Sequence, residues 1–174
     1  MGKIINGAPP SISVTATSAS NASPSTDSPN HIVVTANFSS ATWNTVGTHE
    51  VFTVTGAVRV RLWQLCTQTL EDAADLATIQ FGDALASDDF IGSTGAAGNG
   101  GVTLSAGQWW YDTSPEFAIS TFNAVVLDMV IGNGEDIGYE LAGEALTAGK
   151  IEFHCAWEPL TAGSTVVAGA GGAL

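Results

Sequence analysis

Apolar and polar residues alternate along much of the chain, which is the pattern of strands that bury one face. The clearest run covers residues 57–66. Its Val58 and Val60 share one face of the predicted strand, whereas Arg59 and Arg61 share the other. The same pattern predicts further strands over residues 31–38, 50–55, 76–81 and 150–157.

Residues 124–141 are predicted to form a β-hairpin. Leu127 and Met129 belong to one alternating run, and a second alternating run leads to Leu141. Between the two runs lies Asn133-Gly134, which suits a tight turn because both residues tolerate positive φ.

A short helical segment is predicted between two of the strands. Thr69 opens a run that resembles a helix N-cap, and Leu70, Ala73 and Ala77 then follow at helical spacing. We therefore expect one or two helical turns at this point of the chain.

Residues 1–30 differ from the rest of the sequence. Ser, Thr and Ala make up most of residues 11–30, and only Lys3 and Asp27 carry charge before Glu50. Alone, such a segment buries too little apolar surface to offset the entropy lost on ordering. We interpret it as an extended arm that neighbouring subunits hold in place.

Seven or eight strands separated by turns predict an all-β chain. The expected architecture is a single jelly-roll-like β-sandwich over residues 31–160. It follows the arm of residues 1–30 and precedes a Gly/Ala-rich C-terminal tail over residues 161–174. We expect the arm and the tail to contact other subunits.

Charge narrows the range of functions. The chain has 17 acidic residues and only four basic ones, Lys3, Arg59, Arg61 and Lys150, for a formal charge of −13. Proteins that bind nucleic acid need clustered cations to displace counterions, so we expect no nucleic-acid partner. We also expect no membrane partner, since no apolar run approaches the length of a membrane helix, and no signal peptide is visible.

The sequence contains no recognisable catalytic motif, and we expect neither enzymatic activity nor a cofactor or metal. Cys66 and Cys155 fall in strand-like runs, where free cysteines behave as small buried hydrophobes; a disulfide is the alternative. The three histidines are expected at strand surfaces, with a metal cluster as the alternative: His31, His49 and His154.

The run Trp109-Trp110-Tyr111 is the most conspicuous aromatic feature. Consecutive residues of a strand face opposite sides, so we expect one tryptophan in the core and the other outside or in a subunit contact. A carbohydrate platform is the alternative. Seven residues are candidates for an interface: Ile4, Ile5, Ile12, Val14, Trp109, Trp110 and Tyr111.

Three stretches carry a resemblance to known proteins. Residues 49–56, the strand up to Cys66, and the closing run 153–160 resemble small structural proteins from the virions of tailed bacteriophages. The resemblance covers roughly residues 31–168 and implies a head decoration (cement) protein or a small fibre-like component, often trimeric and often a jelly roll or related sandwich.

We therefore expect a structural virion protein on the outer surface of the capsid, made in the host cytoplasm. Its expected role is to bind and stabilise neighbouring capsomers, with the major capsid protein and copies of itself, a homotrimer above all, as partners. The alternative is a head-fibre or tail-associated adhesin that binds host-surface glycans. A small β-sandwich hydrolase is the third hypothesis, and no residue constellation supports it.

Overall fold

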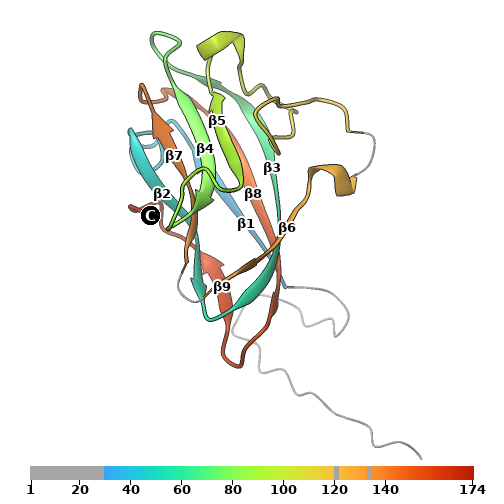
Figure 1. Ribbon diagram of the computed structural model, residues 1–174. Helices are drawn as coiled ribbons and strands as arrows, with labels where there is room; N and C mark the ends of the chain where they lie inside the picture. The colour runs from blue at the N-terminus through green and yellow to red at the C-terminus, as the bar shows by residue number, and fades with distance from the viewer. Residues whose placement is uncertain (1–29, 120–121, 133–134) are drawn as a thin grey trace, which may run out of the picture.

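The computed structural model describes residues 30–119, 122–132 and 135–174. The described strands form two antiparallel sheets that lie face to face, as Figure 1 shows. The prediction of an all-β sandwich is confirmed.

The first sheet has four strands in the order β1-β8-β3-β6. Their bounds are β1 (Asn30–Asn37), β8 (Ala148–Pro159), β3 (Val58–Glu71) and β6 (Leu127–Ile131). The second sheet has five strands in the order β5-β4-β7-β2-β9. Their bounds are β5 (Ile91–Gly95), β4 (Thr78–Asp83), β7 (Ile137–Ala142), β2 (Gly47–Thr55) and β9 (Thr165–Ala168). Two short 3₁₀ helices are η1 (Asn99–Gly101) and η2 (Phe122–Val125).

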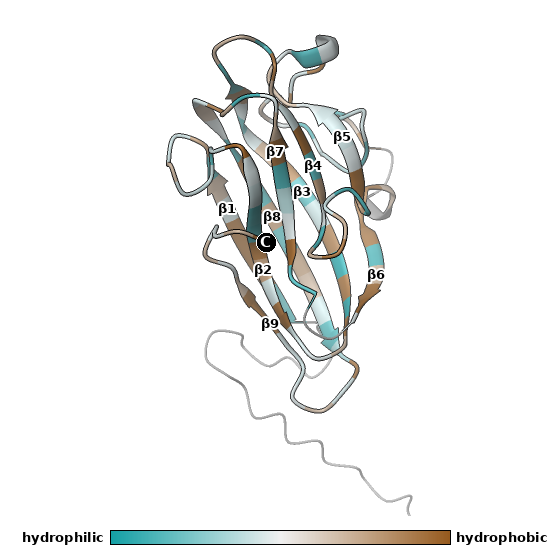
Figure 2. Cartoon of the chain, turned by 60° about the vertical axis from the view of Figure 1, so that its left-hand side comes forward, coloured by the Kyte–Doolittle hydropathy of each residue, from teal (hydrophilic) through white to brown (hydrophobic). Residues whose placement is uncertain are grey.

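The core lies between the two sheets and follows the alternation of the sequence. In β3, Val58, Val60 and Leu62 are fully buried, whereas the arginines between them face outward. Figure 2 shows β6 as mostly apolar, interrupted by a polar band. Large aromatic rings from both sheets meet in the centre of the core: Phe81, Trp110, Tyr139 and Phe153.

The predicted hairpin over residues 124–141 is wrong. β6 pairs with β3 in one sheet, whereas β7 pairs with β2 and β4 in the other, so the chain crosses between the sheets. The alternation of apolar and polar residues predicts which face of a strand is buried, but it does not predict which strand pairs with it. The proposed turn residues, 133 and 134, lie outside the described residues.

The predicted helical turns after Thr69 are also wrong. β3 continues to Glu71, and the carboxylate of Asp72 then accepts the backbone N–H groups of the residues that follow: Asp75, Leu76 and Ala77. A carboxylate that could cap a helix can equally close a turn, because both structures present free N–H groups nearby. Asp75 takes up a left-handed conformation with φ of 57°, which directs the chain into β4 instead of a helix.

The C-terminal residues belong to the sandwich. β9 pairs with β2, and the backbone beyond it continues along the same strand. Gly169 N–H donates to Val51 C=O at 2.8 Å, and Glu50 N–H donates to Gly172 C=O at 2.7 Å. The predicted tail over residues 161–174 therefore contributes β9 and a sheet edge held by backbone hydrogen bonds within its own chain.

The predicted arm lies almost wholly outside the described residues, and so do the candidate interface residues Ile4, Ile5, Ile12 and Val14. No helix in the described ranges is long and apolar enough to cross a membrane.

Candidate interaction surface

The outward face of the four-stranded sheet is the part of the described chain best suited to contact a partner. We call it the outer face. It exposes apolar side chains at both of its edges, where Val33 of β1 is 44% exposed and Val130 of β6 is 64% exposed. Between them project polar and aromatic residues of β8 and β3: Glu152, His154, Glu158, Arg59, Arg61 and Trp63.

Three aromatic rings from three adjacent strands form a cluster on the outer face. His31 comes from β1, His154 from β8 and Trp63 from β3. Ring centroids are 5.2 Å apart for Trp63 and His154, 5.3 Å for His31 and Trp63, and 5.5 Å for the two histidines. The three ring planes lie within 11° of parallel, so the rings stack on one another.

Electrostatics favour the neutral form of His154 within this aromatic cluster. Its Nδ1 lies 3.4 Å from His31 Nε2, and its Nε2 lies 3.6 Å from a carboxylate oxygen of Glu152. Burial lowers the pKa of His154, the nearby His31 lowers it further, and Glu152 opposes both effects. A neutral ring loses less hydration when it stacks against its neighbours than a charged ring would.

Stability should therefore fall as acid protonates His154. Its pKa is lower in the folded chain than the ordinary 6.5, so below that pH the unfolded chain binds more protons and the free energy of unfolding drops. We expect His154→Gln to flatten this loss between about pH 7.5 and about pH 5.5 in urea denaturation. Asp128→Asn is the control, because Arg59 lowers the pKa of Asp128 and keeps its titration below this range. An unchanged slope for His154→Gln would contradict the prediction.

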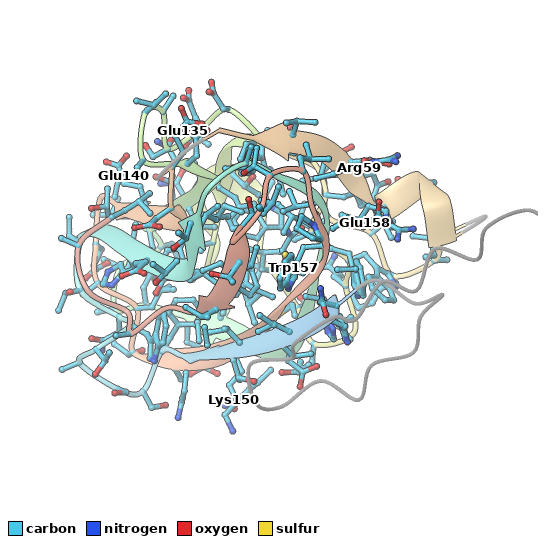
Figure 3. The ribbon with its side chains drawn as sticks, turned by 90° about the horizontal axis from the view of Figure 1, so that it is seen from below. Arg59, Glu135, Glu140, Lys150, Trp157 and Glu158 are labelled. Atoms are coloured by element: carbon cyan, nitrogen blue, oxygen red, sulfur yellow. The ribbon has the colours of Figure 1, made fainter. Side chains whose placement is uncertain are left out.

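Charges on the outer face nearly balance one another. Arg59 donates two hydrogen bonds to Asp128, at 2.9 and 2.7 Å, and Arg61 lies 3.6 Å from Glu158. Figure 3 shows Arg59 near Glu158 and Lys150 projecting away from the body. In total, three cations and four carboxylates project from this sheet, for a net charge of −1: Arg59, Arg61, Lys150, Glu71, Asp128, Glu152 and Glu158.

The rest of the described chain carries no Lys or Arg and nearly all of the excess acid. Lys3 and Asp27 cancel within residues 1–29 and the outer face carries −1, so −12 of the formal charge of −13 comes from outside the outer face. Two acidic bodies repel each other wherever such charge gathers. The outer face is therefore the side on which another molecule approaches with the least repulsion.

The two tryptophans of residues 109–111 differ in burial, as predicted. Trp110 is fully buried, and its Nε1 donates to Thr94 Oγ1 at 3.1 Å. Trp109 is half-buried and its backbone pairs with Glu116, while Tyr111 is also half-buried. The prediction of one core tryptophan is confirmed, and the three residues do not form a common platform.

His49 is not at the strand surface, so the prediction for it is wrong. It is buried and stacks on Tyr139, with ring centroids 4.9 Å apart. Its Nε2 lies 2.7 Å from Thr45 C=O, and its Nδ1 lies 3.1 Å from Thr42 C=O and 3.3 Å from Gly171 C=O. The ring therefore joins the loop before β2 to the C-terminal residues. The alternation within the strand could not predict this contact, because Gly171 lies 122 positions away in the chain.

The cysteines are free and buried, as predicted. Burial raises the pKa of both Cys66 and Cys155 to about 12, so neither supplies a reactive thiolate near neutral pH. Within the described ranges, no three His, Cys, Asp or Glu side chains are grouped to hold a metal ion.

Sequence reasoning missed the aromatic cluster because its members lie far apart along the chain. His31 and His154 are 123 positions apart. Each residue occupies an outward position of an alternating strand, which is the one signal available. Only the pairing of β8 with both β1 and β3 brings the three rings together.

The fold is a β-sandwich, and the outward face of its four-stranded sheet is close to charge balance. No protein-family model, curated protein or solved structure matches the chain significantly.

Proposed function

We propose that the chain is a non-enzymatic structural subunit of a virus particle. In this role it is a capsid decoration (cement) protein that binds neighbouring capsomers and copies of itself on the outer surface of the capsid. The observation that carries the proposal is the outer face, which is close to charge balance on an otherwise acidic body.

Docking through this face follows from its composition. Tryptophan and arginine dominate the binding energy of many protein interfaces, and Trp63 and Arg61 lie side by side in β3 with their outward neighbours in β8. Val33 and Val130 add apolar area at the edges. The remaining acidic surface disfavours contacts between copies through the other faces, while repetition on a lattice makes weak single contacts sufficient.

The order of the strands supports the same role. The first strand pairs with the eighth, the second with the seventh, the third with the sixth, and the fourth with the fifth. A long hairpin rolled into two sheets gives these pairs, so we propose a jelly roll to which β9 is added. Jelly rolls build many viral capsid proteins, and this supports the proposal without deciding it.

Removal of Trp63 tests the proposal. Particles stripped of this protein should bind the added full-length chain at many sites, and Trp63→Ala should weaken binding by about 10- to 100-fold. Leu85→Ala is the matched control, because Leu85 is 76% exposed on the loop after β4, away from the outer face. Quantitative mass spectrometry of purified particles gives the copy number. Absence of the chain from particles, or full binding by Trp63→Ala, would contradict the proposal.

We propose a glycan-binding adhesin as the second candidate, and the aromatic cluster on the outer face favours it. Sugar rings pack their C–H faces on aromatic rings, and Glu152 and Arg61 could accept and donate hydrogen bonds to the hydroxyl groups beside them. Glycan-array binding lost in Trp63→Ala but retained in Trp109→Ala would support this role. Binding that survives Trp63→Ala would exclude the cluster as the glycan site.

A further inference from the structure

Among the described residues, the outer edge of β1 is unpaired and can accept another strand. β1 lies at the outside of its sheet, and among the described residues its ladder is with β8 alone. The ladder runs through eight consecutive residue pairs without a bulge. Edge strands are usually protected by proline, lysine or a bulge, and β1, with the sequence NHIVVTAN, has none of these.

The other three edge strands offer less to a partner. β6 has five residues and carries Asp128, and β9 has four residues. β5 has five residues, two of them glycine, and its ladder with β4 contains a register shift. β1 is therefore the longest and most regular edge in the described part of the chain.

The sandwich also has space for a strand at this edge. β1 lies across from β2 and β9, and β9 extends the five-stranded sheet beyond β2. The four-stranded sheet has no described strand beyond β1. A fifth strand beside β1 would make the two sheets equal in width and would lie across from β9.

Residues 11–17 repeat the sequence of β1. Their sequence, SISVTAT, matches residues 31–37, HIVVTAN, at four positions: Ile12 with Ile32, Val14 with Val34, Thr15 with Thr35 and Ala16 with Ala36. In β1, the apolar residues of this set face inward, where Val34 and Ala36 are buried and Ile32 packs against the core. A strand with the same alternation can extend the inner face of the sheet by one strand.

We infer that residues 11–17 of one molecule add as a strand to the β1 edge of a second molecule. Charge permits this approach, because residues 1–29 are neutral overall whereas the described body carries −13. Main-chain hydrogen bonds along the edge supply the affinity, and the inward Ile12 and Val14 supply the register.

The connector favours a second molecule over the same one. Residues 18–29 are 12 residues, which span up to about 40 Å when extended, enough to cross to a neighbouring body. Pro24 and Pro29 favour extended backbone, and Pro29 directly precedes β1. Two prolines in a connector of this length favour an extended path away from β1 over a return onto it.

Proline substitution in the donor segment tests the inference with the full chain. We expect wild type to self-associate in light-scattering and sedimentation measurements, and Val14→Pro to raise the dissociation constant by about 100-fold, since proline removes a ladder donor. Ser20→Pro is the matched control in the connector and should associate like wild type. A wild type that stays monomeric, or a Val14→Pro chain that associates normally, overturns the inference.

A peptide-binding experiment identifies the sheet edge that accepts the donor strand. A labelled peptide with the sequence of residues 11–17 should bind the Val14→Pro chain, whose own donor strand is disabled, and should slow hydrogen exchange in β1. The same peptide with proline in place of Val14 should not bind. Protection of another edge, or no binding, overturns the assignment to β1.

The inference rests on the proposed function and deepens it, because a shell subunit needs contacts with its own copies. Different experimental results would contradict the strand exchange and the decoration role. Chains that exchange strands in solution but do not bind particles would contradict only the decoration role. Monomeric chains that still bind particles through Trp63 would contradict only the strand exchange.

Discussion

Replacing Trp110 by alanine should lower the free energy of unfolding by about 3–5 kcal/mol, the largest loss that we expect from one aromatic residue. The indole is fully buried between Phe81 and Phe153, with centroids 6.1 and 6.4 Å away. Its removal leaves a cavity and takes away the donor that Thr94 Oγ1 accepts. Urea denaturation followed by far-UV circular dichroism measures the effect.

Trp109→Ala is the matched control for this substitution. Trp109 is half-buried, so its truncation should cost about 1–2 kcal/mol, well below the loss at Trp110. Equal losses at the two positions would contradict the placement of Trp110 alone in the core. The comparison also matters for any binding assay, since a Trp110 variant that loses a ligand would do so through unfolding.

Replacing Gln64 by methionine should raise the free energy of unfolding by about 1–3 kcal/mol. Gln64 faces inward from β3, opposite Phe153, and is 1% exposed. Both polar atoms of its amide are buried, and no described residue gives either one a hydrogen bond. Methionine has a similar length and no polar group to desolvate, so the fold no longer bears the cost of an unsatisfied amide.

Gln80→Met is the control for this prediction. The Gln80 amide nitrogen donates to Ser87 Oγ at 2.8 Å and to Glu140 Oε2 at 2.9 Å, so the same substitution should cost about 1 kcal/mol. The two variants should therefore differ in sign when their urea midpoints are compared. A loss of stability for Gln64→Met would contradict the prediction and would mean that its amide is satisfied in solution.

The strands and their buried faces could be predicted from the sequence. Val58 and Val60 are buried, Ile151 and Phe153 are buried, and Arg59 points outward, all as alternation indicates. This succeeds because the direction of a side chain from a strand is a local property that changes at every residue. The sandwich follows, since many such strands must cover their apolar faces with one another.

The partners of those strands could not be predicted in the same way. Residues 124–141 have the alternation and the turn of a hairpin, yet β6 and β7 lie in different sheets. Thr69 and the alanines after it suggest a helix, but Asp72 closes a turn there. In both cases contacts with distant strands outweigh a local preference of a few tenths of a kcal/mol to about 1 kcal/mol.

The sequence by itself determined the acidic charge, the alternating strands and the repeat of β1 within residues 11–17. Only the tertiary structure decided that His31, Trp63 and His154 meet, and that every Lys and Arg in the described ranges lies on one sheet. The physical reason is that a surface is assembled across strands: its members come from β1, β3 and β8, and the ladders between these strands join residues up to 127 positions apart.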